Sequence, residues 1–121
     1  MTKMGIRTQA LAVRPASCCV PIAGPDVGPG EAEAAAGLFR ALADPNRVRL
    51  VNMLANAGDA VCVCDLTERI GLSQGTVSFH LKKLFGSGLI DREQRGTWAY
   101  YSLNRAALAS VADVFVEGVS R

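Results

Sequence analysis

Several classes of protein are excluded by what this sequence lacks or holds in small amounts. No apolar run approaches the roughly 20 residues of a membrane-spanning helix, so we expect no membrane partner. The sequence has one histidine and shows no nucleophile–base–acid set, phosphate-binding loop or carboxylate pair, so we predict neither an enzyme nor an organic cofactor. Aromatic residues make up 6% of the chain, so Ala, Leu and Val must do most of the core packing.

The first residues lack the apolar core of an export signal. A small-residue stretch before Cys18 is faintly similar to a lipoprotein cleavage site, but the apolar core is only "ALAV" and ends at Arg14. We therefore expect a cytoplasmic protein, in a compartment where thiols stay reduced. There, four cysteines indicate metal or redox chemistry more than a framework of disulfides.

Charge is unevenly distributed along the chain. The net charge of +2 is too small to indicate nucleic-acid binding by itself. Residues 66–105 carry six basic and three acidic side chains, a net of +3, whereas residues 23–65 carry three basic and six acidic ones, a net of −3. Residues 1–22 add three basic side chains and no acid. Such a distribution is a mild form of the charge pattern of a DNA-binding protein.

The chain divides into an arm and one folded domain. Residues 1–30 contain four of the five prolines and several glycines, a composition typical of a flexible arm, and they carry the pair Cys18-Cys19. Residues 31–121 are predicted to form one domain. Its predicted helices cover residues 31–43, 45–57 and 65–71 and the stretches "LSQGTVSFHLKKLFGSG" and "NRAALASVADVFVEGV".

Capping residues mark where these helices should begin. Asp44 can cap the second helix, and Ser73 is a suitable cap for the fourth. The helix over 65–71 is expected to begin near Asp65, with Glu68 three residues later as in a capping box.

The middle of the chain follows the plan of a helix-turn-helix, because a short helix, a glycine-containing turn and a longer helix with a polar outer face come in that order. Two β-rich runs then flank a turn predicted at Arg95-Gly96. In that register Ile90 pairs with Tyr101 on one face of the hairpin. The predicted fold is mainly α with a β-hairpin wing, a winged helix-turn-helix.

The second helix of this unit and the wing hold the candidate contacts to DNA. Gln, Ser and Thr can hydrogen-bond to base edges, and Lys and Arg can neutralise phosphates. The candidate DNA-binding residues are Gln74, Thr76, Ser78, His80, Lys82, Arg92 and Arg95. For His80 the alternative is a partner in the core or at a cap. For the helix as a whole, the alternative is a solvated face without DNA.

Three segments of the domain resemble the ArsR-SmtB family of bacterial metal-responsive repressors. They are "FRALADPNRVRLVNML", "CVCDLTERIGLSQGTVSFHLKKL" and "SGLIDREQRGTWAYYSL", and the resemblance covers about residues 31–118. It implies a homodimer that binds double-stranded operator DNA and releases it when an ion binds. It also implies that Gln74, Ser78 and His80 fall on the DNA-reading motif, in which Phe79 replaces a common polar residue. The apolar stripes of the first and last helices exceed what a small core can use, so we expect them to form the dimer surface.

The resemblance also implies a thiolate site at Cys62 and Cys64, at the start of the helix over 65–71. Thiolates select soft ions, but two thiolates are few ligands for a tight and selective site. The other two, Cys18 and Cys19, lie in the arm, which some family members bring to this helix, often from the other subunit. We predict a repressor of the arsenite-sensing type with an N-terminal cysteine pair. As(III), or Sb(III), would be held by both arm thiols and one helix thiol, with Cys64 favoured.

Other interpretations of the cysteines stay open. A Cd(II) or Pb(II) sensor would use all four thiolates. A thiol-redox repressor would change the same helix by oxidation of either pair, although vicinal disulfides are strained. Cys62, between two valines, has the further alternative of being an inert buried hydrophobe.

Overall fold

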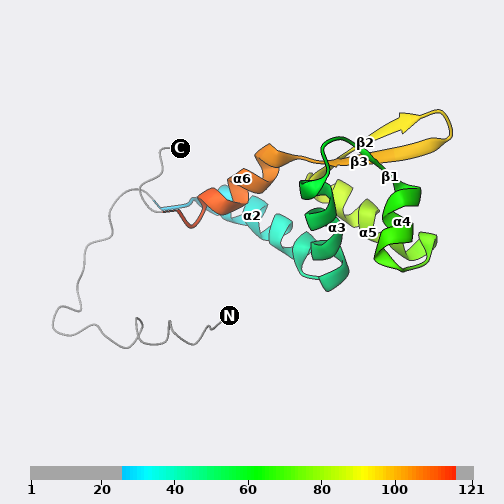
Figure 1. Ribbon diagram of the computed structural model, residues 1–121. Helices are drawn as coiled ribbons and strands as arrows, with labels where there is room; N and C mark the ends of the chain where they lie inside the picture. The colour runs from blue at the N-terminus through cyan, green and yellow to red at the C-terminus, as the bar shows by residue number, and fades with distance from the viewer. Residues whose placement is uncertain (1–25, 117–121) are drawn as a thin grey trace.

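The computed structural model describes residues 26–116 and has the architecture that the sequence predicts (Figure 1). Its elements in chain order are α2 (Pro29–Leu42), α3 (Pro45–Asn56), β1 (Val61–Cys62), α4 (Val63–Ile70), α5 (Gln74–Ser87), β2 (Ile90–Arg95), β3 (Trp98–Leu103) and α6 (Arg105–Asp113). The three strands form one antiparallel sheet in the order β1-β3-β2. The fold is therefore a winged helix-turn-helix, with α4 and α5 as the two helices and β2-β3 as the wing.

Helix α2 begins at Pro29, two residues before the predicted start. The arm cysteines Cys18 and Cys19 lie outside the described residues, as do residues 117–121. Helices α2 and α6 lie side by side at one end of the domain, and the wing extends at the other (Figure 1). Between residues 26 and 116, no helix combines the length and apolar character needed to cross a bilayer.

Two of the predicted caps are confirmed. The carboxylate of Asp44 accepts hydrogen bonds from the backbone N–H groups of Asn46 at 2.8 Å and Arg47 at 3.3 Å. Desolvation opposes the charged form of Asp44, but these backbone hydrogen bonds and nearby positive charge, including that of Arg47, together hold the pKa of the carboxyl group below its usual value. The hydroxyl of Ser73 accepts from the backbone N–H of Thr76 at 3.2 Å and so caps α5.

The predicted start of the thiol-bearing helix is wrong. Helix α4 begins at Val63, and its cap is Cys62, whose sulfur accepts a hydrogen bond from the backbone N–H of Cys64 at 3.3 Å. The reason is the short strand β1, which the sequence pattern does not predict. Cys62 pairs with Tyr100 of β3, so the chain leaves the sheet at this cysteine and enters the helix at once. Asp65 therefore lies within the first turn, not at the cap.

The predicted register of the wing is also wrong, by two residues. Ile90 pairs with Leu103 and not with Tyr101, because the two-residue turn is Gly96-Thr97. Gly96 has a φ of 65°, and a hairpin turn of the II′ type takes glycine with positive φ at its first central position. Because the shift is two residues and not one, Ile90 and Tyr101 still lie on the same face of the hairpin, as predicted.

The core lies between α3, α4, α5 and the sheet. The side chains of Val77, Leu81 and Leu84 form an apolar stripe along α5, and this stripe is fully buried. It packs in one cluster with side chains that α3, α4 and the sheet contribute. Because both helices of the helix-turn-helix pack into this cluster, the buried stripe fixes which side chains of α5 face outward.

Candidate nucleic-acid interface and thiol pair

The outer face of α5 carries four of the five predicted DNA-binding side chains of that helix. Gln74, Ser78 and Lys82 are exposed and lie one helical turn apart, on one side of the helix. Thr76 is exposed in the first turn, where its hydroxyl oxygen accepts a hydrogen bond from the hydroxyl of Ser73 at 2.9 Å. A helix that presents amide, hydroxyl and ammonium groups in this way is suited to the major groove.

His80 is not among these outward side chains. It is 7% exposed, and its Nδ1 lies 3.2 Å from Nη1 of Arg47. A guanidinium group can only donate, so this Nδ1 accepts and the ring proton is on Nε2. Nε of Arg47 also donates to the backbone carbonyl of Ala41 at 2.6 Å. The structure therefore corrects the DNA-contact hypothesis for His80 and places it in the core, where it joins α5 to α3.

The two predicted arginines of the wing lie in different surroundings. Arg92 lines the groove between α5 and the wing, where its Nε donates to the hydroxyl of Tyr101 at 3.3 Å. Arg95 is paired with Glu93, because its Nε and Nη2 each donate to a carboxylate oxygen at 3.2 Å. Its guanidinium also lies 4.3 Å from the ring centroid of Tyr100. The hydrogen bond to Glu93 raises the pKa of Arg95, so its charge is permanent but largely compensated.

The groove between α5 and the wing has a volume of about 740 Å³ and joins the two predicted DNA-contacting elements. Gln74, Ser78 and Lys82 line its helix side, and Arg92 lines its wing side. Three exposed aromatic residues that are not among the predicted contacts also line it, namely Phe79, Phe85 and Trp98. Phe79 and Phe85 lie outside the apolar stripe of α5, and this spacing in the sequence could have indicated that their rings are exposed.

The structure brings the two helix cysteines to the N-terminus of α4. Cys62 is 6% exposed, whereas Cys64 is exposed. A hydrogen bond between the side chains of Cys64 and Cys62, then desolvation and the charges of Cys62 and Asp65, raise the pKa of the Cys64 thiol. Within the described ranges no three His, Cys, Asp or Glu side chains come together as a metal site. The two thiols therefore offer soft ligands but no complete site among residues 26–116.

These features define the class of protein. A helix-turn-helix with a polar outward helix, followed by a β-hairpin that shares a groove with it, is a winged-helix DNA-binding domain. Residues 44–92 match the family described as "Bacterial regulatory protein, arsR family". The chain belongs to this family, because it is also 38% identical over 80 residues to the arsenical resistance operon repressor of Escherichia coli (strain K12), a match that covers 66% of this chain and 68% of that protein.

Further similarities agree with this assignment. The chain is 47% identical over 66 residues to the arsenical resistance operon repressor of Bacillus subtilis (strain 168), which is 54% of this chain and 62% of that relative's length. Among solved structures, it resembles the homodimeric winged helix-turn-helix DNA-binding domain Mb0332 of Mycobacterium bovis. That match has a TM-score of 0.61 and 25% identity and covers 77% of this chain and 86% of the other.

Proposed function

We propose that the chain is a metalloid-responsive transcriptional repressor. Its ion-free homodimer binds double-stranded operator DNA, and As(III) or Sb(III) bound by cysteine thiolates makes it release the DNA. One observation carries this proposal: the exposed and the buried thiol flank the start of α4, the first helix of the DNA-binding unit, and one of them is paired into the same sheet as the wing. An ion held there acts on both DNA-contacting elements.

The DNA contacts are proposed to come from the groove between α5 and the wing. Gln74 and Ser78 have the donors and acceptors to meet base edges, and Lys82 and Arg92 have the charge to meet phosphates. Thr76 adds a hydroxyl in the first turn of the helix. Arg95 is proposed to contribute less to phosphate binding, because Glu93 compensates its charge.

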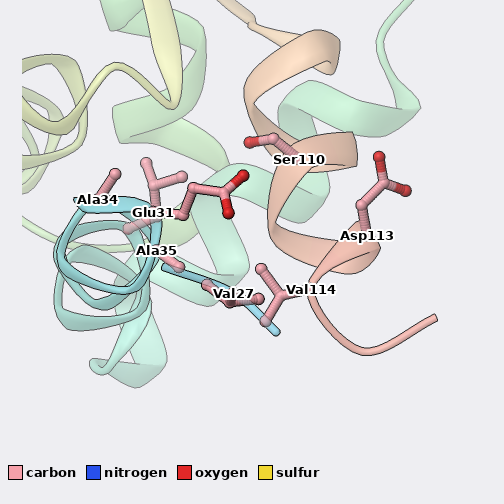
Figure 2. A pocket seen from close by; sticks show the side chains of 8 residues that line it. Val27, Glu31, Ala34, Ala35, Ser110, Asp113 and Val114 are labelled. Atoms are coloured by element: carbon pink, nitrogen blue, oxygen red, sulfur yellow. The ribbon is translucent and has the colours of Figure 1, made fainter. Parts of the chain in front are cut away.

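The dimer is proposed to form through α2 and α6. A pocket of about 330 Å³ lies between these helices, and the carboxyl group of Glu31 points from α2 toward α6 (Figure 2). Its lining combines apolar side chains such as Ala34, Ala35 and Val114 with the polar Ser110 and Asp113. The exposed rings of Phe39, on α2, and Phe115, which follows α6, also meet at a tilt with centroids 5.8 Å apart. Apolar surface gathered on two neighbouring helices is typical of an interface. A two-fold dimer would place its two α5 helices about 34 Å apart, in successive major grooves.

The proposed ion site takes Cys64 as the ligand from α4, with Cys18 and Cys19 as its partners. The exposure of Cys64 supports this choice, because an ion can reach its sulfur without any change in the core. Cys62 would have to give up its burial and its cap hydrogen bond. Three thiolates complete the coordination of As(III). Each thiol that binds arsenite replaces one hydroxyl group on the arsenic, and that hydroxyl leaves as water with the thiol proton.

The release of DNA is proposed to follow two paths from this site. One runs from α4 into α5, through the turn at Gly71, which has a φ of 79°. The other runs from Cys62 across the ladder to Tyr100 and on along β3 to Tyr101, which accepts from Arg92 in the groove. A coupling of about 1–3 kcal/mol between ion and DNA would weaken operator binding by about 5–150-fold.

The proposal is tested with a fluorescently labelled duplex that the reduced, ion-free chain selects from a random-sequence pool. Arsenite should lower the anisotropy of the wild-type complex, whereas Cys64→Ser should bind the duplex equally well and keep it. Thr67→Ser, on the same helix, is the matched control and should respond like the wild type. Release of DNA from Cys64→Ser at the wild-type arsenite concentration would overturn the ligand assignment, and failure to select any duplex would overturn the repressor itself.

The alternatives are distinguished in the same assay. A Cd(II) or Pb(II) sensor would respond to those ions at lower concentration than to arsenite and would show four thiolates per ion in its sulfur-to-metal absorption. A redox repressor would release DNA on mild peroxide, with a disulfide detected by mass spectrometry, and would ignore arsenite. A regulatory role without catalysis and a cytoplasmic location, where thiols stay reduced, are parts of the proposal.

A further inference from the structure

Phe79 is a large apolar side chain on the outer face of the DNA-facing helix. It is 54% exposed, and it lies off the buried stripe of α5. Together with Ser78 and Lys82 it lines the groove between the helix and the wing. A single exposed phenylalanine is common on protein surfaces and needs no explanation by itself. Its surroundings decide whether it has a role.

The ring of Phe79 is held in place from the protein side. The imidazole of His80 meets it edge-on, with centroids 5.6 Å apart and an interplanar angle of 66°. His80 is itself buried and fixed by Arg47 at 3.2 Å. An aromatic side chain supported in this way loses little conformational freedom when a partner contacts its exposed part. The ring is therefore prepared for a contact on its outer side.

The groove around this ring is basic. Nζ of Lys83 lies 5.5 Å from the ring centroid, and Lys82 and Arg92 line the same groove. No acidic side chain lines the groove in the part of the chain that the structure describes. This combination of basic and aromatic side chains suits a polyanion that also presents a small apolar group. In the major groove of duplex DNA, the apolar group at a base edge is the C5-methyl of thymine.

We infer that Phe79 contacts a thymine methyl group in each half of the operator and is a specificity-determining residue of this DNA-binding protein. The inference deepens the proposed function and rests on its DNA-binding part, but not on the ion. Gln74 and Ser78 would supply hydrogen bonds to neighbouring base edges, while Phe79 selects A·T pairs in one orientation at its own step.

The test is a thymine-to-uracil scan, because uracil differs from thymine only by the missing methyl. The probe is the duplex that the reduced full-length chain selects from a random-sequence pool, with each thymine replaced in turn. At one thymine in each half-site, uracil should weaken wild-type binding by about fourfold, the effect of exposing one methyl group. Replacement in both half-sites together should weaken binding by about tenfold or more. Phe79→Ala should bind all of these duplexes with the same affinity.

The matched control is Phe85→Ala, which removes another exposed ring of the same helix, nearer its C-terminus. This variant should keep the uracil effect, and Phe79→Leu should keep part of it. A circular-dichroism melt verifies that each variant is folded. The inference is overturned if no thymine shows a methyl effect, if Phe79→Ala retains the effect, or if Phe85→Ala loses it. Those three results leave the repressor proposal intact, whereas a chain that selects no duplex would overturn both.

Discussion

Replacing Arg47 with methionine should destabilise the domain more than the same replacement of Arg49, on the same helix. This side chain joins three helices, because its Nε donates to the carbonyl of Ala41 at the end of α2 and its Nη1 donates to His80 on α5. Methionine keeps much of the apolar stem and removes only the donors. The change therefore isolates the two hydrogen bonds.

The expected loss is about 2.5–4 kcal/mol of the free energy of unfolding. A hydrogen bond from a charged donor contributes about 1.5–3 kcal/mol, and a buried acceptor left unpaired costs about 1–3 kcal/mol. Arg47 is only half-buried, so water replaces part of what methionine removes and the lower part of the summed range applies. For a domain of this size the melting temperature should fall by about 10–25 °C. The variant should still fold, since the total free energy of unfolding of a native domain is about 5–15 kcal/mol.

The assay is urea denaturation at a fixed protein concentration, because a dimer's stability depends on concentration. Arg49→Met is the matched control, since Arg49 is an exposed residue of the same helix with a single long hydrogen bond of 3.5 Å to the carbonyl of Ile70. The control should change the stability by less than about 0.5 kcal/mol. Arg47→Met combined with His80→Leu should lose less than the sum of the two single variants. Equal losses for Arg47→Met and Arg49→Met would refute the reasoning.

Three further predictions concern the groove, a cap and the thiols. Arg92→Gln should weaken binding to the selected duplex and reduce its salt dependence by about one phosphate contact, whereas Arg95→Gln should change both less; anisotropy at several salt concentrations measures this. The pKa of Asp44 is lowered by folding, so its stabilisation is complete above the usual carboxyl pKa of 3.8 and is lost as the pH falls further; acid unfolding of Asp44→Asn should lack that component. At pH 8 iodoacetamide should alkylate Cys64 slowly for an exposed thiol, and Cys62→Ala, which removes the largest cause of the raised pKa, should accelerate it, as peptide mass spectrometry can show.

Much of the fold could be predicted because its signals are local. The apolar stripe of α5 and the caps Asp44 and Ser73 depend on residues within one or two helical turns of each other. The start of α4 could not be predicted in this way. Asp65 is the better cap by residue type, but the pairing of Cys62 with Tyr100, 38 positions along the chain, decides where the helix begins.

In the candidate DNA-binding site, the contacts on α5 were predicted better than those on the wing. The helical periodicity alone could have placed His80 in the core. It lies three residues after Val77 and four before Leu84, on the buried side of α5. The strand register of the wing depends on the position of Gly96 within the turn, which residue composition does not determine. The difference between the two wing arginines depends on a pairing between Arg95 and Glu93 that only the folded hairpin creates. The joint site of helix and arm thiols stays a prediction.

The most direct test of the central claim records ion capture and DNA release in one titration of the reduced, full-length protein. Arsenite is added to its complex with the labelled duplex while sulfur-to-arsenic absorption and duplex anisotropy are read together. We expect the absorption to rise with three thiolates per arsenite as the anisotropy falls, at the same equivalence point, and Cys64→Ser to lose both changes. DNA released without any rise in absorption, or full absorption with the duplex still bound, would contradict it.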